Sequence, residues 1–387
     1  MAHTSFFVGS LAWNIGLGMT WLALPLYANS QGLSNAEIGL LIALPVLAQM
    51  PLNLAGGAYA DRIGGRRIML GSCCVMVAAA LWLMWARGFW MLVLGQLGLI
   101  LSRATFWPAT WAMASELPGD RGIQLGRLNA VTNLGQISGT VLSGLLLSSA
   151  GFQTTFGVLA GMGASAFFAG LGSRPGPRHP HAAGRHVLAS YLPLLRNRVV
   201  HYSILCAYLS ALPFSLSVSF YPLLLAQFGY HEASSGILLA LRALGAIGAG
   251  LIVGRFVRTG PETLWPVVCG LAVAAAVGLM PLVNHAVPIG FWLLVVGIGS
   301  AAMTLYFQIT ISEASRVEER GSALALGGLG WSVSHFSTPL VMGLIADRFG
   351  IVTGFYAIGG LALACALFIA WARRWAFRGG AKKAVRA

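Results

Sequence analysis

The feature that most constrains this chain is a series of twelve apolar runs, each about 20 residues long and separated by short polar breaks. A helix of about that length crosses the hydrocarbon core of a bilayer. Only 9% of the 387 residues are charged and 57% are hydrophobic, against roughly 25% charged residues in an ordinary soluble domain. The pattern predicts an all-α membrane protein with twelve transmembrane helices, at residues 6–28, 37–58, 68–86, 89–114, 128–149, 154–172, 201–226, 236–254, 265–284, 289–311, 323–345 and 352–372.

The positive charge of the chain is a topology signal. Its formal net charge is +14, which in a soluble protein would point to nucleic acid, but a mean hydropathy of +0.78 excludes that class. If both termini are cytoplasmic, 20 of the 24 Lys and Arg residues fall in cytoplasmic segments. This asymmetry is the one that orients membrane helices. We therefore expect a multi-pass protein with both termini inside, whose basic loops meet the lipid bilayer rather than nucleic acid.

The chain is divided by its longest polar break and repeats itself across it. Pro25 matches Pro222 at an offset of 197 residues, and Gly144 matches Gly343 at an offset of 199. A direct repeat of six spans predicts two bundles related by an axis along the membrane normal, a parallel repeat. The break contains His179, His181 and His186; a solvated linker is preferred over a metal site because Pro, Gly and Arg lie between them. The predicted parts are an N-terminal six-helix bundle (1–172), a cytoplasmic central loop (173–199), a C-terminal six-helix bundle (200–375) and a basic cytoplasmic tail (376–387).

The turn between the second and third spans reads GGAYADRIGGRR. With the twelve spans and the basic central loop, it resembles the major facilitator superfamily (MFS) over essentially the whole chain. The resemblance implies a secondary transporter of the cell inner membrane that works by alternating access, as a monomer and without a cofactor. It also implies that Asp61 braces the cytoplasmic side against the start of the eleventh span, 323–345. The family pattern G-x-x-x-D-R-x-G-x-R-R is carried here by Gly57, Asp61, Arg62, Gly64, Arg66 and Arg67.

Two cytoplasmic loops look like the paired braces of the same family. SELPGDRG follows the fourth span and SEASRVEERG follows the tenth, and each joins a Glu to an Arg. The second half carries Arg258 where the first has Asp61, so we expect the gating to be asymmetric. The alternative is that these charges only set topology. The gating candidates in the two loops are Glu116, Arg121, Glu313 and Arg320.

Arg103 is the most informative single residue. It lies near the middle of the fourth span, where a charged side chain costs about 2.5–3.5 kcal/mol on insertion scales and does not face lipid. The resemblance places this helix among those that line the substrate cavity. The alternative is an arginine satisfied by carbonyls of a neighbouring helix. Helical spacing puts Gln96, Arg103, Trp107 and Trp111 on one face.

Other polar and aromatic residues are candidates for the central seam between the bundles. His335, in the span 323–345, could titrate near neutral pH, although a buried structural histidine is an equal alternative. Arg242, in the span 236–254, could instead extend to the outer surface. The remaining candidates for the substrate pathway are Asn14 and Trp21 in the span 6–28, Tyr208 in the span 201–226, and Thr304, Tyr306 and Gln308 in the span 289–311.

The absences narrow the function. No Asp or Glu is placed deep in a span, which removes support for a cationic substrate. The helix 5 antiporter motif of the family is incomplete, with Thr140 where it has proline. We predict proton-coupled export of a small amphiphilic or anionic organic solute; uptake of an anionic metabolite and a non-transporting receptor on the same fold are the alternatives. No nucleophile, base and acid set or metal motif lies in the spans, so neither an enzyme nor a metal site is expected, and the five cysteines predict no disulfide.

Overall fold

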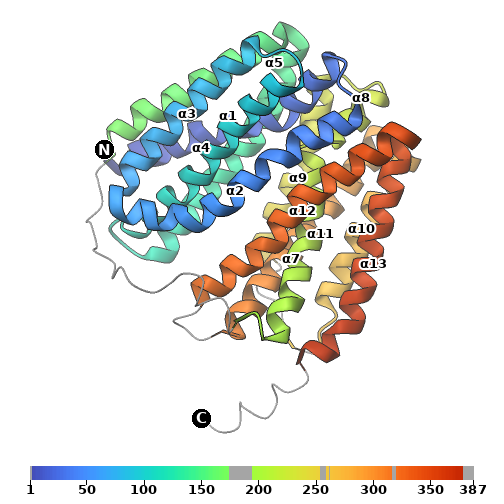
Figure 1. Cartoon of the computed structure of the whole chain (residues 1–387). Coiled ribbons are helices and arrows are strands. Elements are labelled where there is room, and N and C mark those ends of the chain that lie inside the picture. The colour runs from blue at the N-terminus through green and yellow to red at the C-terminus, as the bar shows by residue number, and fades with distance from the viewer. Residues whose placement is uncertain (1, 174–193, 253–258, 261, 316–319, 378–387) are drawn as a thin grey trace. The chain divides into compact units, whose positions relative to one another are not determined.

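The computed structural model describes residues 2–173, 194–252, 259–260, 262–315 and 320–377, but not the side chains at 2, 53–63, 121–122, 251–252, 320–322 and 325. The described part is helical and contains no strand (Figure 1). Its helices are α1 (Ala2–Ser30), α2 (Asn35–Ile63), α3 (Gly65–Trp85), α4 (Phe89–Ser115), α5 (Arg121–Leu171), α7 (Arg198–Ser217), α8 (Tyr221–Gln227), α9 (Glu232–Ile252), α10 (Trp265–Leu279), the 3-10 turn η2 (Met280–Leu282), α11 (Ala286–Glu313), α12 (Arg320–Phe349) and α13 (Ile351–Phe377).

These helices confirm the predicted all-α membrane fold. Ten helical stretches in the described part are long and apolar enough to cross a membrane. One of them, Ile123–Leu171, holds both the fifth and the sixth predicted spans, which separate at Gly151, where φ is 76°. Glycine adopts this conformation without the cost that a side chain would bring. The eleventh predicted span is α12, which is not among the ten.

The seventh predicted span, 201–226, is two helices rather than one. α7 ends at Ser217 and α8 begins at Tyr221, with Pro222 in the first turn of α8. Pro222 has no N–H to donate to the carbonyl of Val218, so the helical ladder is interrupted there. The alternating serines before it offer the backbone competing hydrogen bonds. The ninth span is likewise shorter than predicted, because α10 passes into η2 at Pro281.

The chain forms two compact units. Unit 1 comprises Met1–Ala182 and Ser217–Ala240, and unit 2 comprises Ala183–Leu216 and Leu241–Ala387. The predicted domain boundaries remain predictions.

Unit 1 is built around α1, which packs along α5. The two backbones lie so close that a Cβ added to Gly139 would stand 2.0 Å from the carbonyl oxygen of Ile15. Small residues permit such an approach in membranes, where packing and not water drives helix association. The segment Ser217–Ala240 joins this unit through contacts of α8 with α1 and through Gly144 of α5, whose Cβ would lie 2.4 Å from the carbonyl oxygen of Glu232.

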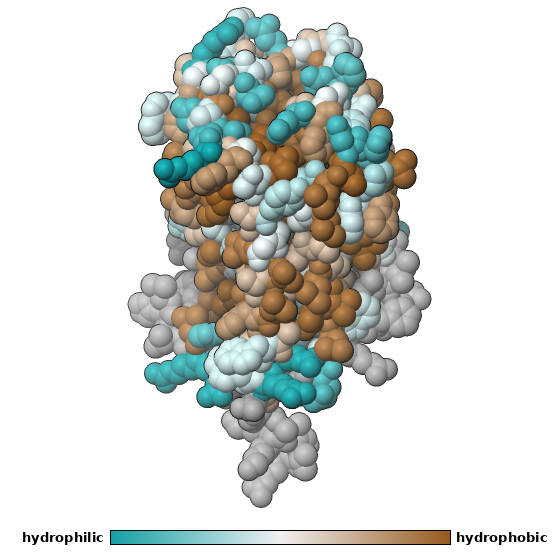
Figure 2. Space-filling view, turned by 90° about the vertical axis from the view of Figure 1, so that its right-hand side faces the viewer, coloured by the Kyte–Doolittle hydropathy of each residue, from teal (hydrophilic) through white to brown (hydrophobic). Residues whose placement is uncertain are grey.

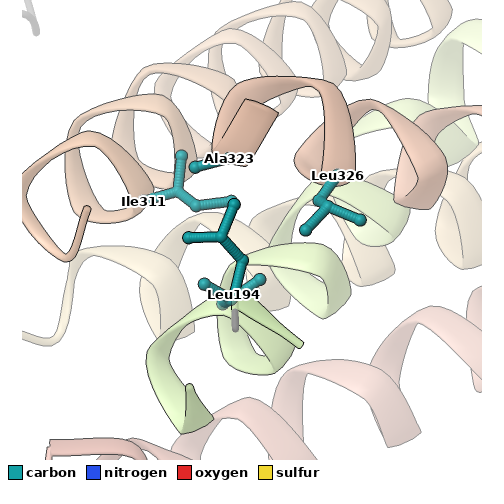
Figure 3. Packing of buried hydrophobic residues seen from close by; sticks show 5 residues of the cluster. Leu194, Ile311, Ala323 and Leu326 are labelled. Atoms are coloured by element: carbon teal, nitrogen blue, oxygen red, sulfur yellow. The ribbon is translucent and has the colours of Figure 1, made fainter. Parts of the chain in front are cut away.

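Unit 2 contains a small apolar cluster where the chain enters α7. Leu194, just before α7, packs against Ile311 near the end of α11 and against Ala323 and Leu326 at the start of α12 (Figure 3). The Asn197 side chain beside it donates to the carbonyl of Ala314 at 3.2 Å. This cluster fixes the start of α7 against α11 and α12.

The surface has the distribution of a membrane protein. Figure 2 shows hydrophobic residues over the middle of one face and hydrophilic residues at its two ends. Large apolar side chains such as Trp85, Trp90 and Trp371 are about 70% exposed, and tryptophans are enriched at membrane–water interfaces. All five cysteines are free in this structure.

Candidate substrate pathway

Arg103 lies buried in the middle of α4, with 9% of its surface exposed. Its Nη2 donates a hydrogen bond to Oε1 of Gln49 on α2. Its Nε has no hydrogen-bond partner in the described part of the chain. A guanidinium carries five N–H donors, so one amide oxygen satisfies only part of it. The predicted alternative, in which backbone carbonyls satisfy the arginine, is replaced by this side-chain contact with a neighbouring helix.

Two tryptophans continue the face of α4 that Arg103 begins. Trp107 stacks on Trp111 with ring centroids 6.3 Å apart, and it meets Trp13 of α1 edge-on at 6.5 Å. Trp111 is 52% exposed. Trp107 and Trp111, one and two turns after Arg103 in α4, therefore form a stacked pair of indoles, and their part in a substrate pathway remains a prediction. Gln96, two turns earlier, is half-buried.

Trp13 anchors the opposite side of this stripe. Its ring stacks on Phe106 at 3.9 Å, and its Nε1 donates to Oγ of Ser102 at 3.2 Å. Ser102 in turn donates to the carbonyl of Ser72 on α3. This chain links α1, α4 and α3 and holds the rotation of α4 that places Arg103.

Helix α1 contributes the other predicted residues of unit 1. Asn14 is fully buried, donates to the carbonyl of Ser10 at 2.8 Å and accepts from Nε2 of Gln136 on α5 at 3.3 Å. Trp21, two helical turns further along the same face, is 7% exposed. Asn14 thus serves the α1–α5 contact, which lowers its availability to a solute.

In unit 2 the structure brings Arg242 and His335 to one aromatic ring. The imidazole of His335 stacks on Phe214 of α7 at 5.0 Å with an interplanar angle of 10°, and Cζ of Arg242 lies 5.3 Å from the same ring. Nδ1 of His335 is 2.6 Å from Oγ of Ser215. Trp331, one turn before His335, meets the imidazole at 5.4 Å. The structure therefore does not show Arg242 extending to the outer surface.

The backbone around Arg242 is held in place by α11. A Cβ on Gly297 would lie 2.0 Å from the Arg242 carbonyl oxygen, so the two helices touch at this level. Further along α11, Thr304 donates to the carbonyl of Ser300, and Tyr306 is 1% exposed and packs edge-on against Tyr202 at 6.4 Å. Gln308 is exposed. The three predicted α11 residues therefore do not form one cluster.

Tyr208 of α7 is half-buried, and its hydroxyl lies 3.2 Å from Oγ of Ser337 on α12. It stands two turns of α7 before Phe214 and belongs to the same α7–α12 contact as the His335 cluster.

The gating candidates are described in part. Arg66 donates from Nε to the carbonyl of Gly170 at 3.3 Å and from Nη2 to that of Leu171, so it caps the end of α5. Gly64 has φ of 95°, which explains why the family pattern carries glycine there.

Other gating candidates lie at the surface. Arg67 and Glu116 are exposed, and the exposed Glu313 accepts from Oγ1 of Thr259 at 2.5 Å. The side chains of Gly57, Asp61, Arg62, Arg121 and Arg320 lie outside the described residues, as do His179, His181 and His186.

Sequence reasoning missed the neighbours that give the charged residues their settings. Gln49, Phe214 and Trp331 were not predicted as site residues, because an amide or an aromatic ring within an apolar run carries no sign of its partner. Among the described residues no group of three or more His, Cys, Asp and Glu could hold a metal ion.

The fold and its buried charges are those of a membrane transporter, and comparison with known proteins agrees. The family model of the Major Facilitator Superfamily matches residues 5–306. The chain belongs to this superfamily. It is therefore a transporter and not an enzyme.

Similar proteins cover nearly the whole chain. The 3-(3-hydroxy-phenyl)propionate transporter of Escherichia coli (strain K12) is 24% identical over 369 residues, 90% of this chain and 88% of that protein. The quinolone resistance protein NorA of Staphylococcus aureus (strain MSSA476) is 22% identical, covering 86% and 87%. The nitrite extrusion protein of Bacillus subtilis (strain 168) is 24% identical, covering 88% and 86%.

Solved structures agree on the fold. A bacterial homologue of the human lysosomal transporter Spinster, inward-facing and unoccupied, has a TM-score of 0.79 at 16% identity and covers 97% of each chain. The nucleoside transporter NupG has a TM-score of 0.77 at 13% identity, covering 97% of this chain and all of that one.

Proposed function

We propose that this protein moves a small amphiphilic or anionic organic solute across the cell inner membrane by alternating access, coupled to protons. The observation that carries the proposal is Arg103, a buried guanidinium with donors to spare beside the stacked Trp107 and Trp111. A desolvated arginine binds carboxylate or phosphate through two parallel hydrogen bonds and repels cations. The indoles add apolar contact for an organic body.

The names of the relatives support an anion. Hydroxyphenylpropionate and nitrite are both negatively charged at neutral pH, and they name two of the three relatives given above. In the described part of the chain every Asp and Glu whose side chain is placed lies in a loop or within three residues of a helix end. A cationic solute would therefore find no carboxylate within the described spans.

Two directions of transport are proposed. Export is supported by two relatives named for resistance and extrusion. Uptake is supported by the buried imidazole of His335 near Arg242, since a bound proton there attracts an anion and does not displace it. The positive-inside distribution of arginines supports cytoplasmic termini, and a monomer is proposed.

The test is transport of a library of organic anions into right-side-out and inverted vesicles, with and without a pH gradient. Arg103→Lys keeps the charge and loses the fork, so affinity should fall while transport persists. Arg103→Ala should weaken binding about tenfold or more, the effect of one charge-assisted hydrogen bond. Arg87→Ala, at an exposed arginine, is the matched control.

A melting temperature of each unliganded variant separates binding from folding. If Arg103→Ala binds and transports every anion as well as the wild type, Arg103 is not a substrate residue. If no member of the library is transported at all, the chain is a receptor on a transporter fold.

A further inference from the structure

Arg103 and Gln49 meet at the middle of their helices. Gln49 is the middle residue of α2 (Asn35–Ile63). Arg103 lies near the middle of α4 (Phe89–Ser115), and its Nη2 donates to Oε1 of Gln49. Because a guanidinium only donates hydrogen bonds, the amide must present its oxygen to it. The contact therefore holds an uncharged acceptor against a buried cation.

The amide satisfies only half of the edge of the guanidinium that it faces. Nε and Nη2 carry two parallel N–H bonds, the fork that binds a carboxylate with one oxygen on each. Gln49 has one oxygen and takes Nη2, while the buried Nε of Arg103 has no hydrogen-bond partner in the described part of the chain. Trp107, one turn further along the same face of α4, has a buried Nε1 that also lacks a partner among the described residues. Native proteins contain few such donors, so two on one helix face indicate a missing acceptor.

The carboxylates of unit 1 lie at helix ends. They are Glu37 and Asp61 in the first and last turns of α2, Glu116 just after α4, Asp120 just before α5, and Glu232 in the first turn of α9. The helices α4 and α2 have 27 and 29 residues, so their ends are roughly 20 Å from the Arg103–Gln49 contact along the axis. The acceptor that the fork lacks is therefore none of the carboxylates whose side chains the structure describes, and Asp61 stands about 18 Å along α2 from Gln49.

The helix that carries Gln49 is weakened on both sides of it. Pro45 and Pro51 lie inside α2, before and after Gln49. Neither has an N–H, so the carbonyls of Leu41 and Leu47 receive no helical hydrogen bond from them. Helices bend at such positions more easily than where the ladder is continuous. The amide can therefore leave Arg103 without breaking a continuous helix.

We propose that Gln49 sets the affinity of the Arg103 site by holding the place of the solute's carboxylate. The inference rests on the proposed function and adds the exchange that solute binding requires. A carboxamide and a carboxylate share one planar shape, so the solute group fits where the amide was and brings a second oxygen for Nε. Gln49 is half-buried, so the exchange takes place at the border of the buried interior and needs no preformed cavity. The apparent affinity is lowered by the fraction of molecules in which the amide still occupies the fork.

The exchange favours anions over neutral solutes. A neutral carbonyl offers the Arg103 fork one uncharged oxygen, as Gln49 already does, and gains little by replacing it. A carboxylate offers two oxygens and a charge, and hydrogen bonds between charged groups are roughly twice as strong as neutral ones. Gln49 thus keeps neutral solutes off the site.

The first experiment supplies the carboxylate from within the chain. Gln49→Glu keeps the length of the side chain and adds the second oxygen, whereas Gln49→Met keeps the length and removes the acceptor. In the unliganded full-length protein in detergent, Gln49→Glu should melt at a higher temperature than Gln49→Met. In the Arg103→Met background the order should reverse, because a buried carboxylate then has no cation. The same order in both backgrounds overturns the proposal, since the fork then does not accept a carboxylate.

The second experiment measures binding of benzoate to the same proteins by calorimetry at pH 7, with benzamide as the neutral probe. The wild type should bind benzoate more tightly than benzamide. Gln49→Met removes the internal competitor, so Kd for benzoate should fall about tenfold, the effect of one hydrogen bond. Gln49→Glu supplies a competitor that carries the same charge as benzoate, so Kd should rise about tenfold or more.

Gln153→Met and Gln153→Glu are the matched controls, because Gln153 is an exposed glutamine of α5. Both should bind benzoate as the wild type does. Should Gln49→Met not fold, Gln49→Ala replaces it, because it also removes the acceptor and the same fall in Kd is expected.

The outcomes separate the exchange from the proposed function. A Kd for benzoate that is unchanged or higher in Gln49→Met overturns the role of Gln49, while the proposed function stands if Arg103→Ala still impairs transport in vesicles. Absence of benzoate binding by both the wild type and Gln49→Met overturns the exchange. If the vesicle library also fails, the proposed function fails with it.

Discussion

The two halves of the chain use the same helix pair in different ways. By the repeat offsets, Gly18 and Gln136 on α1 and α5 correspond to Ser215 and His335 on α7 and α12. In unit 1 a Cβ on Gly18 would lie 2.2 Å from the Gln136 carbonyl oxygen, so the two backbones touch. In unit 2 the two side chains meet through a hydrogen bond of 2.6 Å.

The α1–α5 contact is a close approach of two backbones, whereas the α7–α12 contact is a hydrogen bond between two side chains. Where a glycine brings the two backbones together, the side chains that bridge the helices, Asn14, Gln136 and Thr140, are amides and a hydroxyl, which do not change charge near neutral pH. Where serine and histidine occupy the same positions, the contact contains an imidazole, a group that can exist in a neutral or a charged form. The duplicated fold can thus keep one helix pair as a fixed support and give the other a variable charge.

The largest effect is expected from breaking the glycine contact of unit 1. In Gly139→Val the new side chain would collide with the carbonyl of Ile15, which is backbone and cannot move aside. Overpacking of this kind costs typically about 1–3 kcal/mol, and a backbone collision places the variant at or above the top of that range. Thermal unfolding in detergent should show a large loss of folded protein.

Gly161→Val is the matched control, because a Cβ there meets nothing within 4 Å. Equal melting temperatures for the two variants would contradict the role given to the α1–α5 contact.

A smaller effect, on transport and not on stability, is expected at the second pair of repeat positions. Asp61→Asn should lower the transport rate about tenfold, as expected if the carboxylate biases one state over another by roughly 1.4 kcal/mol. Arg258→Asn, at the matched position of the second half, should do much less. Vesicle transport measured beside melting temperature checks this, and equal damage from both variants would remove the proposed asymmetry of gating.

The smallest effect is expected on stability, when either of two indole hydrogen bonds of the same length is removed. Nε1 of Trp13 donates to Ser102 in unit 1, and Nε1 of Trp331 donates to Ser210 in unit 2, each at 3.2 Å. Trp13 is fully buried and Trp331 is half-buried. Both acceptors, Ser102 and Ser210, are fully buried, so each change leaves a buried acceptor unpaired. Trp13→Phe should cost about 1–2 kcal/mol and Trp331→Phe less, because less of the Trp331 ring is buried and less apolar contact is lost with it. Melting temperatures in the reverse order would contradict this reading of burial.

The spans could be predicted because each needs a long apolar run and the polar breaks between them are short. The break before Pro222 could not, since a proline and scattered serines also occur within continuous membrane helices, as Pro25 does within α1. Arg103 stood out as a charge at mid-span, but its partner Gln49 is 54 residues away and depends on how α2 and α4 pack. His335 was recognised as titratable, and its neighbours followed only from three helices in contact.

The membership of Ser217–Ala240 in unit 1 has a consequence for biosynthesis. At a synthesis rate of about 5–20 residues per second, the ribosome needs about 3–12 s to proceed from Ala182 to Ala240. Throughout that interval Gly144 of α5 has been synthesised but lacks the backbone of Glu232 that will cover it. The first unit therefore completes its packing only after synthesis of the second half has begun.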